Sequence, residues 1–252
     1  MQLDIHFPDR LAFHIRRSNR ARRPSVSVCL HDGVVLTLPQ RFDERHLPAL
    51  LTEWQPWIDK QVAHYEAHRA RLPAEMFARL PENIALPACG GRWQVSYAGS
   101  GKTTRVVDRD GTLTVHNPSG EEASARATLN RWLARTARRH LQARLEELSR
   151  LHDLHYQRLT VRGQRTRWGS CSSTGTISLN YLLMFLAPEL ADSVVLHELC
   201  HTRYMSHGPR FYGLLRRLQP RYDELDQRVR EGWQAIPDWA WPHRTDTPQG
   251  QK

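Results

Sequence analysis

Short runs of alternating apolar and polar residues dominate the first half of the chain, whereas apolar residues at helical spacing dominate the second half. Alternation with a period of two predicts half-buried strands, and apolar residues three and four apart predict helices. The predicted strands span residues 24–30, 33–39, 92–97, 104–108, 112–117, 158–162 and 176–183. The predicted helices span residues 43–72, 121–151 and 188–204, and another helix begins at Pro209.

These elements predict an α+β fold. Residues 1–120 form a strand-rich N-terminal region with one helix, and a turn at 31–33 joins its first two strands into a hairpin. Residues 121–242 form a helical region, and residues 243–252 form a polar tail. The long helix predicted at 121–151 carries its apolar residues on one face, namely Leu129, Trp132, Leu133, Ala137, Leu141, Leu145 and Leu148.

Composition excludes several classes of protein. Hydrophobic residues make up 40% and charged residues 25% of the 252 positions, which is typical of a globular protein rather than a disordered one. No apolar run reaches the roughly 18 residues that a membrane-spanning helix needs. The N-terminus lacks the apolar stretch of a secretory signal, and the four cysteines form no CxxC pair. We therefore expect a cytoplasmic protein with reduced thiols and no membrane contact.

The net charge of +10 allows association with a polyanion such as DNA. An arginine-rich stretch at 16–23 could contact phosphates, or it could be a solvated strand edge that discourages aggregation. Only three of the 36 basic residues are lysines, however, and such a skew is typical of GC-rich coding bias. Charge alone therefore does not decide between these hypotheses.

The helix predicted after Pro188 contains the sequence HExxH at His197, Glu198 and His201. Residues four apart on a helix share one face, so both imidazoles can bind one Zn²⁺ while Glu198 acts as the base for a water molecule. The surrounding residues are largely apolar, and buried histidines need partners that a metal can supply. The alternative is a pair of core histidines bonded to backbone carbonyls.

A zinc site of this kind needs a third ligand. His207 lies six residues after His201, directly before Gly208 and Pro209, which break the helix and let the chain turn back. A carboxylate on a later helix, either Glu224 or Glu231, is the competing candidate. We favour His207.

Several segments together resemble the YgjP-like family of zinc metallopeptidases. The most specific are RTRWGSCSSTGTISLNYLL at 165–183 and HELCHTRYMSHGPRFY at 197–212. Further matching segments are RRSNRARRPSVSV at 16–28, LTLPQRF at 36–42, WQPWI at 54–58 and RWLARTARRHL at 131–141. The resemblance implies a zincin-like core related to the SprT and WLM proteases, in which the active-site helix packs on a small sheet. It also implies that His197, His201 and His207 are the ligands of one zinc ion per chain and that Glu198 is the catalytic base.

The resemblance further implies an edge strand that pairs with an extended substrate, here residues 176–183. Residues in and around that strand are expected to contact the substrate, namely Arg167, Trp168, Ser170, Asn180 and Tyr204. The competing interpretation is that Trp168 packs in the core and Arg167 pairs with a carboxylate. Three tyrosines are candidate donors to the oxyanion, namely Tyr181, Tyr204 and Tyr212.

The sequence therefore predicts a zinc-dependent metallopeptidase that hydrolyses proteins or peptides. Two alternatives stay open at this point. One is a metal-dependent nucleotide (UTP-type) pyrophosphatase, a label that some members of the family carry. The other is a zinc-stabilised DNA-binding module without catalysis. A pyrophosphatase would be expected to carry a carboxylate cluster suited to Mg²⁺ and phosphates, and the sequence shows no such cluster.

Overall fold

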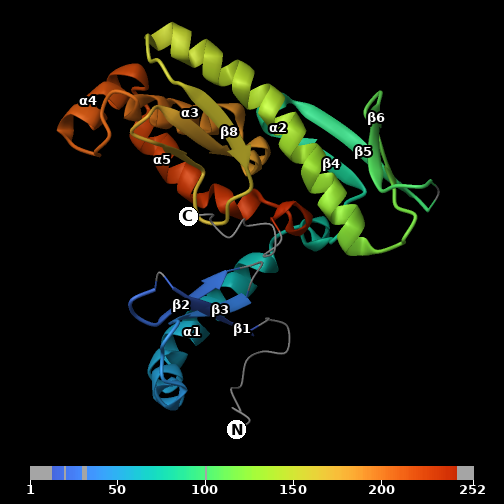
Figure 1. The fold of residues 1–252 in the computed structure, drawn as a ribbon, viewed down its shortest axis with the longest axis vertical. Helices are drawn as coiled ribbons and strands as arrows, with labels where there is room; N and C mark the ends of the chain where they lie inside the picture. Colours follow the sequence, from blue (N-terminus) through green and yellow to red (C-terminus); the bar gives the residue numbers. More distant parts are fainter. Residues whose placement is uncertain (1–12, 20, 30–32, 100, 243–252) are drawn as a thin grey trace. The chain divides into compact units, whose positions relative to one another are not determined.

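The computed structural model describes residues 13–19, 21–29, 33–99 and 101–242 of the chain (Figure 1). The chain divides into two compact units, Met1–Pro73 and Ala74–Lys252. The polar tail predicted at 243–252 lies outside the described residues. Within the described residues, no helix has both the length and the apolar character needed to cross a membrane.

The first unit is a three-stranded sheet with one long helix. Its strands are β1 (Phe13–Ser18), β2 (Ser25–Cys29) and β3 (Gly33–Pro39), and its helix is α1 (Leu47–Arg69). The central strand β3 pairs in parallel with β1 and antiparallel with β2. The predicted hairpin of residues 24–30 and 33–39 is confirmed, because β2 pairs with β3. Its turn at 31–33 lies partly outside the described residues.

The second unit begins with a four-stranded sheet and the longest helix. The elements are β4 (Asn83–Leu86), β5 (Gly91–Ala98), β6 (Arg105–Arg109), β7 (Thr112–His116) and α2 (Glu122–His152). The strand order is β4-β5-β7-β6. The seven apolar residues predicted to share one face of α2 are all buried. They pack with the apolar residues of this sheet in one core, so β4 to β7 belong to the same compact unit as the helices that follow.

A second sheet in this unit has three short strands. They are β8 (Arg158–Arg162), β9 (Gly169–Cys171) and β10 (Thr176–Asn180), in the order β8-β10-β9. The prediction that residues 176–183 form an edge strand is wrong, because β10 lies between β8 and β9 and residues 181–185 form a 3-10 helix. The strand β9 takes the edge position. It is only three residues long, too short to show the alternation by which a strand is recognised.

Three helices complete the second unit, namely α3 (Pro188–His201), α4 (Pro209–Leu218) and α5 (Tyr222–Glu231). A proline at the first turn begins both α3 and α4, where its missing N–H is harmless. Helix α3 contacts β9, α2, α4 and α5, and it lies among the other elements of this unit in Figure 1. The structure thus has the expected α+β class, with the HExxH helix packed on a small sheet.

Candidate metal centre

Helix α3 brings His197 and His201 together one turn apart. Their neighbours Val194, Leu196 and Leu199 are buried, which fixes the orientation of the helix. His201 is buried and His197 is half-buried. Their Nε2 atoms lie 3.2 Å apart.

His207 joins this pair from the segment between α3 and α4. Its Nε2 atom lies 3.1 Å from that of His197 and 3.0 Å from that of His201. Tetrahedral zinc with Zn–N distances of about 2.0–2.1 Å places its nitrogen ligands roughly 3.3 Å apart, so the observed spacing fits three ligands of one ion. Among the residues that the structure describes, these histidines are the one group of three or more His, Cys, Asp or Glu residues that could hold a metal.

The orientation of His201 is set by the backbone of Tyr204. The His201 Nδ1 lies 3.1 Å from the Tyr204 carbonyl oxygen, which accepts a hydrogen bond from the protonated Nδ1. This bond leaves the lone pair on Nε2, which is the tautomer that a metal ligand needs. Tyr204 therefore supports the site through its main chain, while its side chain packs partly buried against the core.

Phe211 on α4 lies against all three imidazoles. Its ring centroid is 4.9 Å from that of His197, 4.4 Å from that of His201 and 4.9 Å from that of His207. The side chain is fully buried, so it forms an apolar contact surface that holds the three rings in place. The spacing of His207 and Phe211, four residues apart at the start of a helix, is the sequence signal for this contact.

Burial favours the neutral form of His197 and His201. Desolvation, together with the like charges that His201 and His207 would carry, lowers the pKa of His197 to about 4. Desolvation also lowers the pKa of His201. A neutral imidazole is the form that binds a metal, so these two side chains do not have to lose a proton first at neutral pH.

Glu198 lies beside the histidines with one oxygen atom unused. Its side chain is 6% exposed, and its buried Oε2 has no hydrogen-bond partner among the described residues. Burial raises the pKa of Glu198 to about 7, against the opposing effect of the nearby Arg167 guanidinium. A buried carboxylate oxygen without a partner, next to three converging imidazoles, fits the presence of a divalent cation and a water molecule.

Gly169 on β9 makes room for Glu198. A Cβ atom at position 169 would lie 2.6 Å from Oε1 and 2.7 Å from Cγ of Glu198, closer than real atoms approach. The glycine of the RWGSC segment is therefore required by the position of the carboxylate. Sequence analysis identified the segment but not this reason for its glycine.

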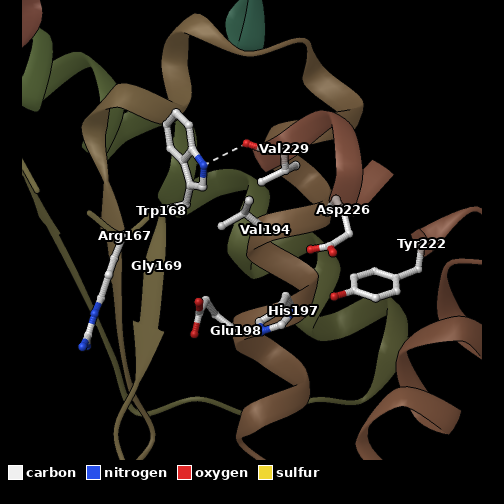
Figure 2. Close-up of a pocket in the computed structure, with 10 residues that line it drawn as sticks. Arg167, Trp168, Gly169, Val194, His197, Glu198, Tyr222, Asp226 and Val229 are labelled. Atoms are coloured by element: carbon white, nitrogen blue, oxygen red, sulfur yellow. Dashed lines mark hydrogen bonds between the residues drawn. The ribbon is translucent and has the colours of Figure 1, made fainter. Parts of the chain in front are cut away.

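A pocket of about 230 Å³ opens beside His197 and Glu198 (Figure 2). Arg167 and Trp168 both line it, as predicted for residues that shape the cleft. Trp168 also packs in the core, because its Nε1 donates to the Val229 carbonyl at 3.1 Å and its ring stacks on Trp233 at 3.8 Å. Trp168 thus packs in the core and lines the pocket at the same time, and its contact with a substrate stays a prediction.

The other predicted substrate residues do not line this pocket. Asn180 is fully buried, and its Nδ2 donates to the carbonyls of Gln164 and Arg167 at 2.7 and 2.8 Å. Asn180 thus positions the segment that carries Arg167 and has no surface left for a substrate. Ser170 is half-buried on β9 and lies outside the pocket lining, as does Tyr204.

Sequence analysis missed the contribution of α5 to the pocket. Tyr222, Asp226 and Val229 line it from one face of this helix, at positions i, i+4 and i+7. The tyrosine in the pocket is thus Tyr222, and none of the three predicted oxyanion donors lines it. The alternative third ligand Glu224 lies on the same helix, but it pairs with Arg221 at 2.6 Å and is not part of the histidine group.

The known proteins to which this chain is similar are metallopeptidases. The family model of the YgjP-like metallopeptidase domain matches residues 22–231. No curated protein matches the sequence. The crystal structure of the abylysin zymogen, a metallopeptidase of Pyrococcus abyssi, is 20% identical with a TM-score of 0.35, over 38% of this chain and 98% of that chain. The jannalysin zymogen of Methanocaldococcus jannaschii is 21% identical with a TM-score of 0.33, over 36% and 94% of the two chains.

Proposed function

The chain belongs to the YgjP-like metallopeptidase family, and on that premise we propose that it is a zinc-dependent peptidase. Its ligands are His197, His201 and His207, and its general base is Glu198. The observation that carries this proposal is the convergence of three Nε2 atoms to within 3.0–3.2 Å of one another beside a buried carboxylate.

The donor set favours zinc over the other common divalent ions. Three neutral imidazoles suit zinc, whereas Mg²⁺ and Ca²⁺ prefer oxygen ligands. One zinc ion per chain, when bound, supplies Lewis-acid polarisation of a peptide carbonyl and lowers the pKa of a water molecule. Three protein ligands leave a fourth position open, which is the arrangement of catalytic rather than structural zinc.

Glu198 is positioned to move the proton during hydrolysis. It accepts a proton from the attacking water and passes it to the leaving amine, which requires a carboxyl group that holds and releases protons near neutral pH. In the metal-free site, burial raises the pKa of Glu198 to about 7, and a bound divalent cation would lower it again. Arg167 lies close enough to act on this carboxylate electrostatically and keeps its pKa from rising further.

The substrate is a protein or peptide that lies extended along β9. This strand is at the edge of its sheet, and its Gly169 directly contacts Glu198. Addition of a substrate strand to such an edge binds the peptide through its backbone and tolerates many sequences. The position of Gly169 then brings a bound peptide bond next to the base.

No specific observation favours the alternative activities. A nucleotide pyrophosphatase would need carboxylates arranged for Mg²⁺, and within the described ranges the histidine trio is the one group suited to hold a metal. Association with DNA and a cytoplasmic location stay predictions.

The experiment that tests the proposal measures zinc content and peptide hydrolysis in the purified full chain. We expect one zinc per chain and hydrolysis of casein in the wild type. Glu198→Gln should retain zinc and lose hydrolysis, because it keeps the shape of the side chain and removes the base. His207→Ala should lose both.

His155→Ala provides the matched control, since the His155 side chain is 86% exposed and is not part of the group that could hold a metal. It should keep both zinc and activity. Full zinc content in His207→Ala would overturn the ligand assignment. Casein hydrolysis by Glu198→Gln at the wild-type rate would overturn the role of the base.

A further inference from the structure

The pocket beside the metal centre has an apolar body. Its walls include Trp168, Val194 and Val229, whose side chains are all buried. Its volume of about 230 Å³ is below the roughly 300–1,000 Å³ of pockets that bind whole small molecules. The dimensions therefore fit a single side chain of a longer ligand whose backbone lies outside.

One carboxylate lies at the α5 side of this pocket. Figure 2 shows the Asp226 carboxylate directed into the pocket beside the Tyr222 hydroxyl group. Burial and the negative charge of the nearby Asp226 raise the pKa of Tyr222, so the phenol remains neutral. Among the other polar residues that line the pocket, Ser193 is already bonded, because its hydroxyl donates to Gln219 Oε1 at 2.8 Å. The second carboxylate of the lining, Glu198, lies beside His197 and not at this end. Asp226 therefore supplies the charge at this end.

The present partner of Asp226 is easily replaced. Arg230 bonds it from the next turn of α5, but the Arg230 side chain is 80% exposed. Exposed pairs of this kind contribute only about 0.3–0.5 kcal/mol, so a cation entering from the pocket can displace Arg230 at little cost. Arg167 does not fill this role, because Figure 2 places it on the opposite side of Glu198 from Asp226.

We propose that this pocket binds the substrate side chain next to the scissile bond and that Asp226 selects lysine or arginine there. The apolar walls hold the aliphatic stem of such a side chain while its charged end reaches the carboxylate. The inference rests on the proposed function. The pocket adjoins His197 and Glu198, and it is a substrate subsite only if a peptide bond is cleaved at these two residues.

The test uses host peptides of alanine and serine that carry one guest residue, either lysine or norleucine. These two side chains share a four-carbon stem and differ in charge. Cleavage by the wild-type enzyme is located by mass spectrometry and quantified as kcat/KM. Binding to the zinc-loaded Glu198→Gln variant is measured by fluorescence polarisation, so that selectivity is read without catalysis.

We expect the lysine peptide to bind and to be cleaved about tenfold better than the norleucine peptide, a difference of about 1.4 kcal/mol. Asp226→Asn should abolish this preference, because it removes the charge and keeps the size of the side chain. Arg230→Ala should increase it, because it removes the competing cation. Asp223→Asn is the matched control on the same helix, since Asp223 is exposed and pairs with Arg216; it should leave the preference unchanged.

Two outcomes overturn the inference. One is equal binding of both peptides to the Glu198→Gln variant with Asp226 intact, and the other is a lysine preference that survives Asp226→Asn. Failure of the proposed function would give a different set of results from failure of the inference. In that case no peptide is cleaved, while the lysine preference in binding and its loss in Asp226→Asn are still observed. If neither peptide binds or is cleaved, both proposals fail.

Discussion

Substitution of Gly169 by alanine should displace the catalytic carboxylate while leaving the fold in place. The new Cβ would lie 2.7 Å from Glu198 Cγ and 2.6 Å from Oε1. Carbon atoms pack at about 3.5–4.0 Å, so the Glu198 side chain must retreat by roughly 0.8 Å or more. The backbone at 169 is outside the left-handed region, so alanine itself is tolerated there.

The expected effect on rate is much larger than the effect on stability. A misplacement of about 1 Å in a catalytic group costs about 100-fold in rate. Overpacking by a single methyl group costs about 1–3 kcal/mol of unfolding free energy. Gly169→Ala should therefore lower kcat/KM about 100-fold and still give a folded protein that retains its zinc, because the three histidines are not displaced.

The assay compares kcat/KM on a peptide substrate, zinc content and urea unfolding. Gly213→Ala is the control, since a Cβ at this position on α4 meets nothing within 4 Å. It should keep full activity and gain about 0.5–1 kcal/mol of stability. In a Glu198→Ala background, Gly169→Ala should no longer reduce stability, because the clashing atoms are gone. Wild-type kcat/KM in Gly169→Ala would refute the argument, as would loss of its zinc.

Three other predictions follow from the same site. Phe211→Ala should lower the unfolding free energy by about 3–5 kcal/mol and let a chelator remove zinc faster, because the apolar contact with the three imidazoles is lost. Urea unfolding measures the first effect, and chelator competition measures the second. Asn180→Ala should lower the unfolding free energy by about 1–3 kcal/mol by leaving two buried carbonyls without donors, again measured in urea. In metal-free protein, the folded-state pKa of Glu198 is raised from 4.5 to about 7, so its stability contribution is full below pH 4.5 and lost as pH rises through 7. Metal-free Glu198→Gln should lack this loss, which amounts to at most about 3 kcal/mol in urea unfolding compared at pH 4.5 and 8.

Local patterns predicted the longer helices and the closeness of His197, His201 and His207. The apolar face of α2 follows from spacing alone, because one face of a long helix must be buried for the helix to be stable. The two histidines of α3 likewise share a face through helix geometry. The start of α4 at Pro209 and the strand at 158–162 were predicted at their observed positions.

Features that depend on packing between distant segments were not predicted. The edge position belongs to β9 rather than β10 because sheet order is a tertiary property that alternation does not encode. Asn180 looked like a substrate contact, but its burial and backbone bonds become visible only once the 164–167 segment folds over it. The α5 wall of the pocket was missed for the same reason, although Tyr222, Asp226 and Val229 share a helical face.

The placement of His207 outside α3 has a consequence for the lifetime of a bound metal. His197 and His201 move together on one rigid helix, while His207 belongs to the segment that leads into α4 and contacts Phe211. An ion held by the trio would thus escape through opening of residues 202–211, without unfolding of the sheet or of α2. Zinc and amide hydrogens at the start of α4 should then exchange on a common timescale, and metal loading should slow both.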